Sequence, residues 1–175
     1  MGSELCIRDS LKIDLSTIFK KNHLSDKLTD KVLSYGEILS TTIIADYLNF
    51  QNIPSEQLIT NNIIITDNNF GNAYVHFQKS FNKIKNYFKE HKKTQIITGF
   101  IGSTEEGEIT TLGRNGSDYT ATLFGTALNA NSIEIWSDVD GVLSTNPNFT
   151  KEARAIPYLT YEAVSYTHLT LPTKA

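Results

Sequence analysis

Two kinds of segment alternate along this chain, and their alternation is the feature that most restricts its fold. Runs rich in β-branched residues predict short buried strands at 57–66, 94–102 and 132–142. Apolar residues at helical spacing predict amphipathic helices at 24–51, 73–91 and 117–130. Strands that alternate with helices are typical of a parallel sheet covered by helices. The sequence therefore predicts an α/β fold.

Local composition gives finer expectations for several segments. Gly36 interrupts the first helical pattern, so we expect a short helix, a break, and a longer helix that begins near Glu37. Residues 67–72 read as a loop, and residues 103–113 as a hairpin or an extended return. Trp136 lies within a predicted strand and is expected in the core.

Charge and cysteine content exclude several classes of protein. The net charge is −3 and the lysines and arginines form no extended patch, which argues against binding to nucleic acid or to a membrane surface. A single cysteine rules out an internal disulfide framework, and the four scattered histidines predict no metal site. The longest apolar run is too short to span a bilayer and no leader precedes it, so we expect a cytoplasmic protein.

The stretch "LGRNGSDY", 112–119, carries more polar groups than a helix cap requires. In open parallel sheets, ligands bind where strands end and helices begin. The guanidinium of Arg114 has the planar fork that fits a carboxylate, while Glu37 and Asp118 offer carboxylates for an ammonium group. Arg114 or Asp118 alone is better explained as an ordinary surface or helix-start residue. Together they predict a pocket for a small amino acid.

A second polar motif, "SDVDGV", follows the strand predicted at 132–142. Ser137 and Asp138 lie where side chains at a strand end contact a nucleotide. Asp-Gly pairs also form ordinary turns, so the motif taken alone is compatible with either role.

The segment from "ITGFIGS" through "LGRNGSDY" to "EIWSDVDGV" resembles the catalytic domain of aspartate kinases, which belong to the amino acid kinase family. "SYGEILST", 34–41, resembles an earlier substrate motif of that family, and the whole resemblance is closest to bifunctional aspartokinase–homoserine dehydrogenases. The resemblance implies a three-layer α/β/α sandwich with a mainly parallel sheet, incomplete here at both ends.

The resemblance also implies a reaction and its residues. The reaction is transfer of a phosphoryl group from ATP, with Mg²⁺, to the side-chain carboxylate of L-aspartate, the first step toward lysine, threonine and methionine. Because an ionised carboxylate is already a nucleophile, catalysis rests on positioning and charge neutralisation. Arg114 and Asp118 match catalytic positions. The matched substrate-binding positions are Glu37, Phe100, Arg114, Ser117 and Asp118, and the nucleotide-binding positions are Ser137, Asp138, Leu143 and Asn148.

Several departures from the family pattern qualify that expectation. Residues 1–30 lack the lysine- and glycine-containing motif that contacts phosphates, and Asn146 and Asn148 replace the usual Asp and Arg. Residues 1–10 and 164–175 match neither the periodicity nor the composition between them, so we expect non-native tails around a partial catalytic domain at 11–163. We expect weak MgATP binding, little activity and marginal stability from this segment alone, and homo-oligomers from the full-length protein.

Two other functions remain open. One is another amino acid kinase, similar to glutamate 5-kinase, and the other is a non-catalytic module that binds an amino acid through Arg114 and Glu37.

Overall fold

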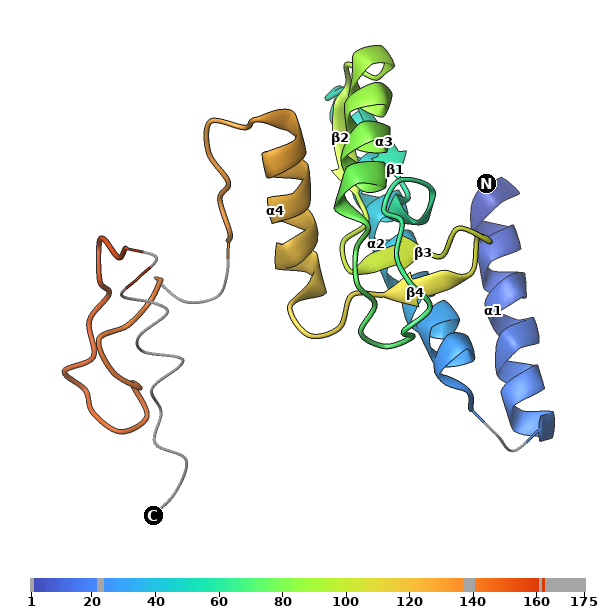
Figure 1. The fold of residues 1–175 in the computed structure, drawn as a ribbon, viewed down its shortest axis with the longest axis horizontal. Coiled ribbons are helices and arrows are strands. Elements are labelled where there is room, and N and C mark those ends of the chain that lie inside the picture. Colours follow the sequence, from blue (N-terminus) through green and yellow to red (C-terminus); the bar gives the residue numbers. More distant parts are fainter. Residues whose placement is uncertain (1, 22–23, 137–140, 161, 163–175) are drawn as a thin grey trace. The chain divides into compact units, whose positions relative to one another are not determined.

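The computed structural model describes residues 2–21, 24–136, 141–160 and 162, and the chain divides into two units, Met1–Ile133 and Glu134–Ala175. All the helices and strands named below belong to the first unit (Figure 1). In chain order they are α1 Gly2–Lys21, α2 Asp26–Phe50, β1 Ser55–Leu58, the 3₁₀ helix η1 Thr60–Asn62, α3 Phe77–Glu90, β2 Thr94–Ile97, β3 Ile101–Ser103, β4 Ile109–Thr111 and α4 Gly116–Leu128.

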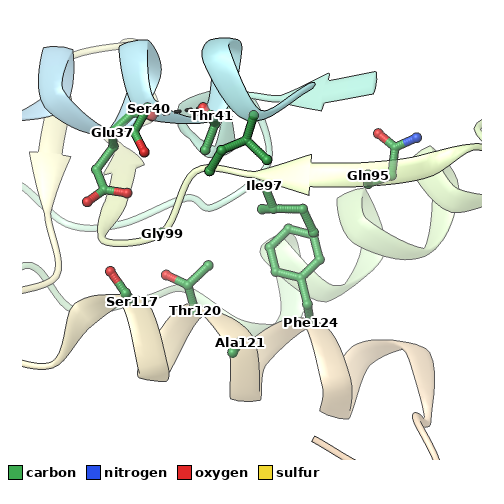
Figure 2. Close-up of a pocket in the computed structure, with 11 residues that line it drawn as sticks. Glu37, Ser40, Thr41, Gln95, Ile97, Gly99, Ser117, Thr120, Ala121 and Phe124 are labelled. Carbon is green, nitrogen blue, oxygen red and sulfur yellow. Dashed lines mark hydrogen bonds between the residues drawn. The ribbon is translucent and has the colours of Figure 1, made fainter. Parts of the chain in front are cut away.

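A parallel pair of strands lies at the centre of this unit. β1 and β2 pair in register from Ser55 opposite Thr94 to Leu58 opposite Ile97. Helix α2 packs against both strands, and Figure 2 shows β2 lying between α2 and α4. The α/β arrangement predicted from the alternating pattern is confirmed.

The hydrophobic core fills the space between the strands and the pair α3 and α4. Ile84 of α3 is wholly buried, and the ring of Phe88 meets the ring of Phe124 edge to face at 6.1 Å. The buried cluster comprises Leu58, Ile63, Ile64, Val75, Ile84, Leu112, Leu123, Phe124 and Ala127. These residues come from β1, α3, α4 and the segments that connect the elements, so one core holds these parts together.

Helix α2 runs without a break through Gly36, so the predicted interruption there is wrong. The Oγ of Ser25 caps its first turn by accepting a hydrogen bond from the N–H of Leu28. A glycine inside a helix costs about 0.5–1 kcal/mol relative to alanine. Burial of the adjacent Tyr35 and of Ile38 offsets that cost, which the local pattern alone could not show.

The strands predicted at 57–66 and 94–102 are each shorter than expected. Leu58 ends β1, and η1 then turns the chain, held by a hydrogen bond from Thr60 Oγ1 to the carbonyl of Ile101 at 2.7 Å. The second run divides into β2 and β3 at Phe100, whose φ of 67° is left-handed. β-branched residues in both runs reflect burial, and burial does not require continuous pairing.

Four other predictions are confirmed, the two helices with shifted ends. β3 and β4 form an antiparallel hairpin in which Ile101 lies opposite Thr111. Residues 67–72 form the expected loop. The last helix spans Gly116–Leu128, whereas α3 begins only at Phe77, because Val75 pairs instead with Thr66.

The prediction of a buried strand over 132–142 is wrong for its first part, 132–136. These residues form no strand and are exposed, and the exposed fraction of Trp136 is 88%, so the predicted core position of this tryptophan is also wrong. β propensity measures how well side chains fit a packed pleated surface. This stretch pairs with no strand in the described part of the chain.

Helix α1 packs against α2 through a buried carboxylate. Asp14 accepts hydrogen bonds from the Tyr35 hydroxyl at 2.7 Å and from Lys31 Nζ at 3.0 Å. Residues 2–10 continue into the same helix as residues 11–21, while the C-terminal segment 164–175 lies outside the described residues. Of the helices in the described ranges, none is both long and apolar enough to cross a bilayer.

Candidate functional site

An open hollow of about 420 Å³ lies between α2 and α4, where β2 ends (Figure 2). Its walls come from segments distant in the sequence, so the hollow exists only in the folded unit. Its lining residues are Glu37, Ser40, Thr41, Ile44, Gln95, Ile97, Gly99, Ser117, Thr120, Ala121 and Phe124.

The two ends of the hollow differ in chemistry. Ile97 and Phe124 line one end, whereas Glu37 and Ser117 point toward each other at the other end (Figure 2). Within the described ranges, the hydrogen bonds and ion pairs leave the half-buried carboxylate of Glu37 without a partner. A lone carboxylate that faces a hydroxyl across a cleft suits a ligand with a cationic group.

Gly99 sets the spacing at the polar end. A Cβ atom at this position would lie 2.7 Å from Ser117 Oγ and 2.9 Å from Ser117 Cα. Only a glycine therefore lets the first turn of α4 approach the end of β2 so closely.

Phe100 holds the same region in a strained conformation. Its φ of 67° is rare for a residue with a side chain, and such conformations cost about 1–3 kcal/mol. The N–H of Phe100 donates to Thr120 Oγ1 at 3.1 Å, and Thr120 Oγ1 donates to the carbonyl of Gly116 at 2.8 Å. The ring packs where a Cβ on Gly116 would stand, at 2.7 Å. These contacts fix Phe100 against the start of α4.

The N-terminus of α4 has no side-chain cap. Asn115 precedes the helix in the left-handed region, with φ 60°, and makes no capping hydrogen bond. Backbone N–H groups at an uncapped start, together with the helix dipole, favour an anion. Arg114 is exposed one residue earlier and belongs to no ion pair among the described residues. A guanidinium and an uncapped helix start therefore lie close to Ser117.

The structure does not bring all the predicted substrate residues into the hollow. Glu37 and Ser117 line it, and Phe100 packs beside it. Arg114 and Asp118 flank Ser117 in the sequence but are exposed and do not line the hollow.

The predicted nucleotide residues all follow the first unit in the sequence. Ser137 and Asp138 lie outside the described residues. Leu143 and Asn148 belong to the second unit, where Leu143 bridges Ala155 and the N–H of Asn148 donates to Asn146 Oδ1 at 2.9 Å. In the described part of the chain, no group of three or more His, Cys, Asp or Glu side chains could hold a metal ion.

Sequence reasoning missed two polar residues that shape the site. Thr120 lies almost one turn after Ser117, a spacing that places both on one helix face. Asp30 is wholly buried on α2, one turn before the buried Ser34. A charged residue in register with a buried helix face was the available signal.

Comparison with known proteins decides the family. The model of the amino acid kinase family matches residues 5–168. The chain belongs to the amino acid kinase family.

Relatives within this family are aspartokinases. The chain is 37% identical over 153 residues to aspartokinase 1, chloroplastic, of Arabidopsis thaliana, which covers 85% of this chain and 27% of the relative. It is 30% identical over 155 residues to a bifunctional aspartokinase/homoserine dehydrogenase 1 of Zea mays, covering 87% of this chain and 17% of the relative. The chain thus spans well under half the length of either, and the resemblance stated from sequence is confirmed.

Solved structures of the family agree with this fold. Escherichia coli aspartokinase III in complex with aspartate and ADP superposes with a TM-score of 0.81 at 29% identity, over 89% of this chain and 35% of that one. The aspartate kinase of Clostridium acetobutylicum gives a TM-score of 0.68 at 28% identity, over 94% of this chain and 36% of that one. The predicted amino acid kinase-like fold, present here in part, is confirmed.

Proposed function

We propose that the chain is the part of an aspartate kinase catalytic domain that binds the acceptor, L-aspartate. The observation that carries the proposal is the carboxylate of Glu37, which has no partner within the described ranges and faces Ser117 in one hollow, beside the uncapped start of α4. Two kinds of comparison support it: the relatives are named aspartokinases, and a similar structure was solved with aspartate and ADP.

L-Aspartate has the charges that this site can match. Its ammonium group would pair with Glu37, and a carboxylate would meet the N-terminus of α4 and the fork of Arg114. Ser117 offers a hydroxyl between these two ends, and Phe100 closes the side of the pocket. Asp118, an exposed acidic residue in the first turn of α4, adds a carboxylate to the same motif.

The reaction then follows from holding the acceptor still. An oxygen of the aspartate side-chain carboxylate attacks the γ-phosphorus of ATP, the bond from that phosphorus to the β–γ bridging oxygen breaks, and ADP leaves with the electron pair. The product is 4-phospho-L-aspartate. The carboxylate nucleophile is already ionised, so no general base is needed, and positioning of the substrates provides most of the rate enhancement.

On the nucleotide side we propose Ser137, Asp138, Leu143 and Asn148 as contacts for ATP. Mg²⁺ keeps several waters and binds mainly through substrate phosphates in such sites. When bound, it offsets phosphate charge. We also propose a homo-oligomeric full-length protein in the cytoplasm, although the Arabidopsis relative is chloroplastic.

Isothermal calorimetry on the 175-residue chain tests the acceptor site. We expect L-aspartate to bind more tightly than L-glutamate. Glu37→Gln should weaken the binding of L-aspartate by at least about tenfold, equivalent to 1.4 kcal/mol, because it removes the charge that faces the ammonium group. Asp46→Asn is the matched control, because Asp46 is an exposed carboxylate on the same helix outside the hollow.

The same titrations separate the alternatives. Preference for L-glutamate would favour a glutamate 5-kinase-like enzyme. Aspartate binding that MgATP neither alters nor turns over would favour a non-catalytic module. Absence of L-aspartate binding would refute the proposal.

A further inference from the structure

Two buried threonines lie on opposite walls of the hollow. Thr41 comes from α2 and Thr120 from α4, and both line the hollow (Figure 2). Their exposed fractions are only 6% and 3%. Each comes about one helical turn after a residue of the acceptor site, Thr41 after Glu37 and Thr120 after Ser117, and so shares a helix face with it. Neither threonine is needed to match a charge of L-aspartate.

Thr41 joins the turn of α2 that carries Glu37 to the sheet. Its Oγ1 donates a hydrogen bond to the carbonyl of Glu37 at 2.8 Å and accepts one from Gln57 Nε2 at 2.7 Å. Gln57 Nε2 also donates to the carbonyl of Ile38 at 2.8 Å. Gln57 lies on β1 and does not line the hollow. The backbone at Glu37 is therefore anchored to β1 by a side chain that does not border the ligand site.

Thr120 joins the first turn of α4 to the end of β2 in a similar way. Its Oγ1 donates to the carbonyl of Gly116 at 2.8 Å and accepts from the N–H of Phe100 at 3.1 Å. This bond helps to hold Phe100 in its left-handed conformation, which is unfavourable by itself. Phe100 directly follows Gly99, against which Ser117 packs. The position of Ser117 relative to the strand thus depends on the hydroxyl of Thr120.

The hydrogen of each hydroxyl already has an acceptor inside the protein. A threonine hydroxyl has one hydrogen to donate, and both are used on backbone carbonyls, those of Glu37 and Gly116. Neither hydroxyl can donate to a carboxylate of a bound amino acid without giving up its bond to the helix. The threonines therefore act on a ligand through the residues that they hold in place. Such residues must be held to within about 0.5 Å of the productive geometry.

We propose that Thr41 and Thr120 are paired positioning residues, which fix Glu37 and Ser117 at the separation at which both contact one amino acid in the hollow. The inference rests on the proposed function. Loss of either hydroxyl should weaken the binding of L-aspartate to chains that remain folded. A purely structural role would lower the stability and leave the dissociation constant of the folded chain unchanged.

Isothermal calorimetry with L-aspartate on the full 175-residue chain tests the proposal, alongside urea unfolding of every variant. Thr41→Val and Thr120→Val keep the shape of the side chain and remove the hydroxyl. Each should raise the dissociation constant by at least about fivefold, the factor that corresponds to one ordinary hydrogen bond. Thr41→Ser and Thr120→Ser retain the hydroxyl and should bind within about twofold of the wild type.

Gln57→Met separates positioning from direct contact with the ligand. Methionine keeps the length of the side chain but has no N–H to donate to Thr41 or to the carbonyl of Ile38. Because Gln57 lies outside the lining, its loss reaches a ligand only through α2. The dissociation constant should again rise by at least about fivefold. An unchanged dissociation constant would refute the anchor on α2.

Thr42→Val and Thr122→Val are the matched controls, one on each helix. The hydroxyl of Thr42 donates to the carbonyl of Ile38 at 2.7 Å, and that of Thr122 donates to the carbonyl of Tyr119 at 2.7 Å. Neither threonine lines the hollow, and within the described ranges neither hydroxyl bonds to the sheet. Both variants should keep the wild-type dissociation constant, whatever their effect on stability.

A wild-type dissociation constant in folded Thr41→Val or Thr120→Val overturns the positioning role, and so does a serine variant that binds as weakly as its valine counterpart. Should a valine variant fail to fold, Gln57→Met decides in its place, since Gln57 is only half-buried. A wild-type chain that binds no L-aspartate refutes the proposed function and this inference with it, so the two failures are distinguishable.

Discussion

At the scale of single residues, the width of the hollow depends on a glycine. A methyl group on Gly99 would press against the backbone and side chain of Ser117. Gly99→Ala should therefore push α4 away from β2, destabilise the chain by about 1–3 kcal/mol as overpacking does, and weaken L-aspartate binding. Denaturant unfolding and calorimetry measure the two effects.

Gly36→Ala is the control for that substitution. A Cβ on Gly36 would have no atom within 4 Å, and the residue lies inside α2. Alanine there should stabilise the chain by about 0.5–1 kcal/mol and leave binding intact. If Gly99→Ala stabilised the chain instead, Ser117 would not lie as close to Gly99 as described.

Arg114 allows a test of geometry separated from charge. Lysine keeps the positive charge but cannot form the two parallel hydrogen bonds of a guanidinium. Arg114→Lys should weaken the binding of L-aspartate by about tenfold, corresponding to 1.4 kcal/mol. The stability of the chain should not change, because Arg114 is exposed. The control is Arg154→Lys, at an exposed arginine of the second unit, which should change neither the binding of L-aspartate nor the stability.

Residue types and spacing predicted Glu37 and Ser117, and the structure places both in one hollow. They could not predict the burial of Asp30, because its carboxylate bonds Thr111, which lies far along the chain. Nor could they show that Arg114 stays outside the lining. Proximity within a sequence motif does not fix the direction in which a side chain points.

At the scale of elements, the contact of α1 with α2 depends on two titrating groups. Burial of Asp14 alone would raise its pKa, but hydrogen bonds from Tyr35 and Lys31 and the charge of Lys31 outweigh burial and lower it. Burial, followed by the hydrogen bond to Asp14 and its charge, raises the pKa of Tyr35 to about 12. Both groups are thus held in their neutral-pH forms by the packed helices.

The signs of these shifts define two pH windows. The lowered pKa of Asp14 contributes stability that is present above its ordinary value of 3.8 and is lost as pH falls through the folded value. The raised pKa of Tyr35 contributes stability that is present below pH 10 and is lost as pH rises through about 12.

Tyr35→Phe removes the hydroxyl that links these groups. We expect a loss of about 1 kcal/mol at neutral pH, typical of a hydrogen bond, and a flatter decline of stability above pH 10. Urea unfolding across the pH range measures both. Tyr47→Phe, at an exposed tyrosine of the same helix, should match the wild type, and equal alkaline slopes for the two variants would contradict the assignment.

The order of helices and strands could be predicted from periodicity, because the spacing of apolar residues is a local property of the sequence. The lengths of the strands could not be predicted in this way. The run at 57–66 is broken by Thr60, whose hydroxyl bonds the carbonyl of Ile101, and the run at 94–102 is broken by the left-handed Phe100. Both breaks depend on long-range partners, and no local pattern encodes them.

At the scale of the whole molecule, the lone tryptophan reports on the start of the second unit. Trp136 is 88% exposed and is the chain's single tryptophan. Its fluorescence should resemble that of free tryptophan, be quenched efficiently by acrylamide, and change little on unfolding. A blue-shifted emission that moves to the red in urea would show the buried tryptophan that the sequence pattern predicts.

The hollow is walled by α2 and α4, which come from nearly opposite ends of the first unit's sequence. A dicarboxylic amino acid seated there would act as a removable cross-link across the fold. By mass action it would add about 2.7 kcal/mol to the unfolding free energy at a hundredfold excess over its Kd. The fraction of folded chains would then rise and fall with the concentration of that amino acid.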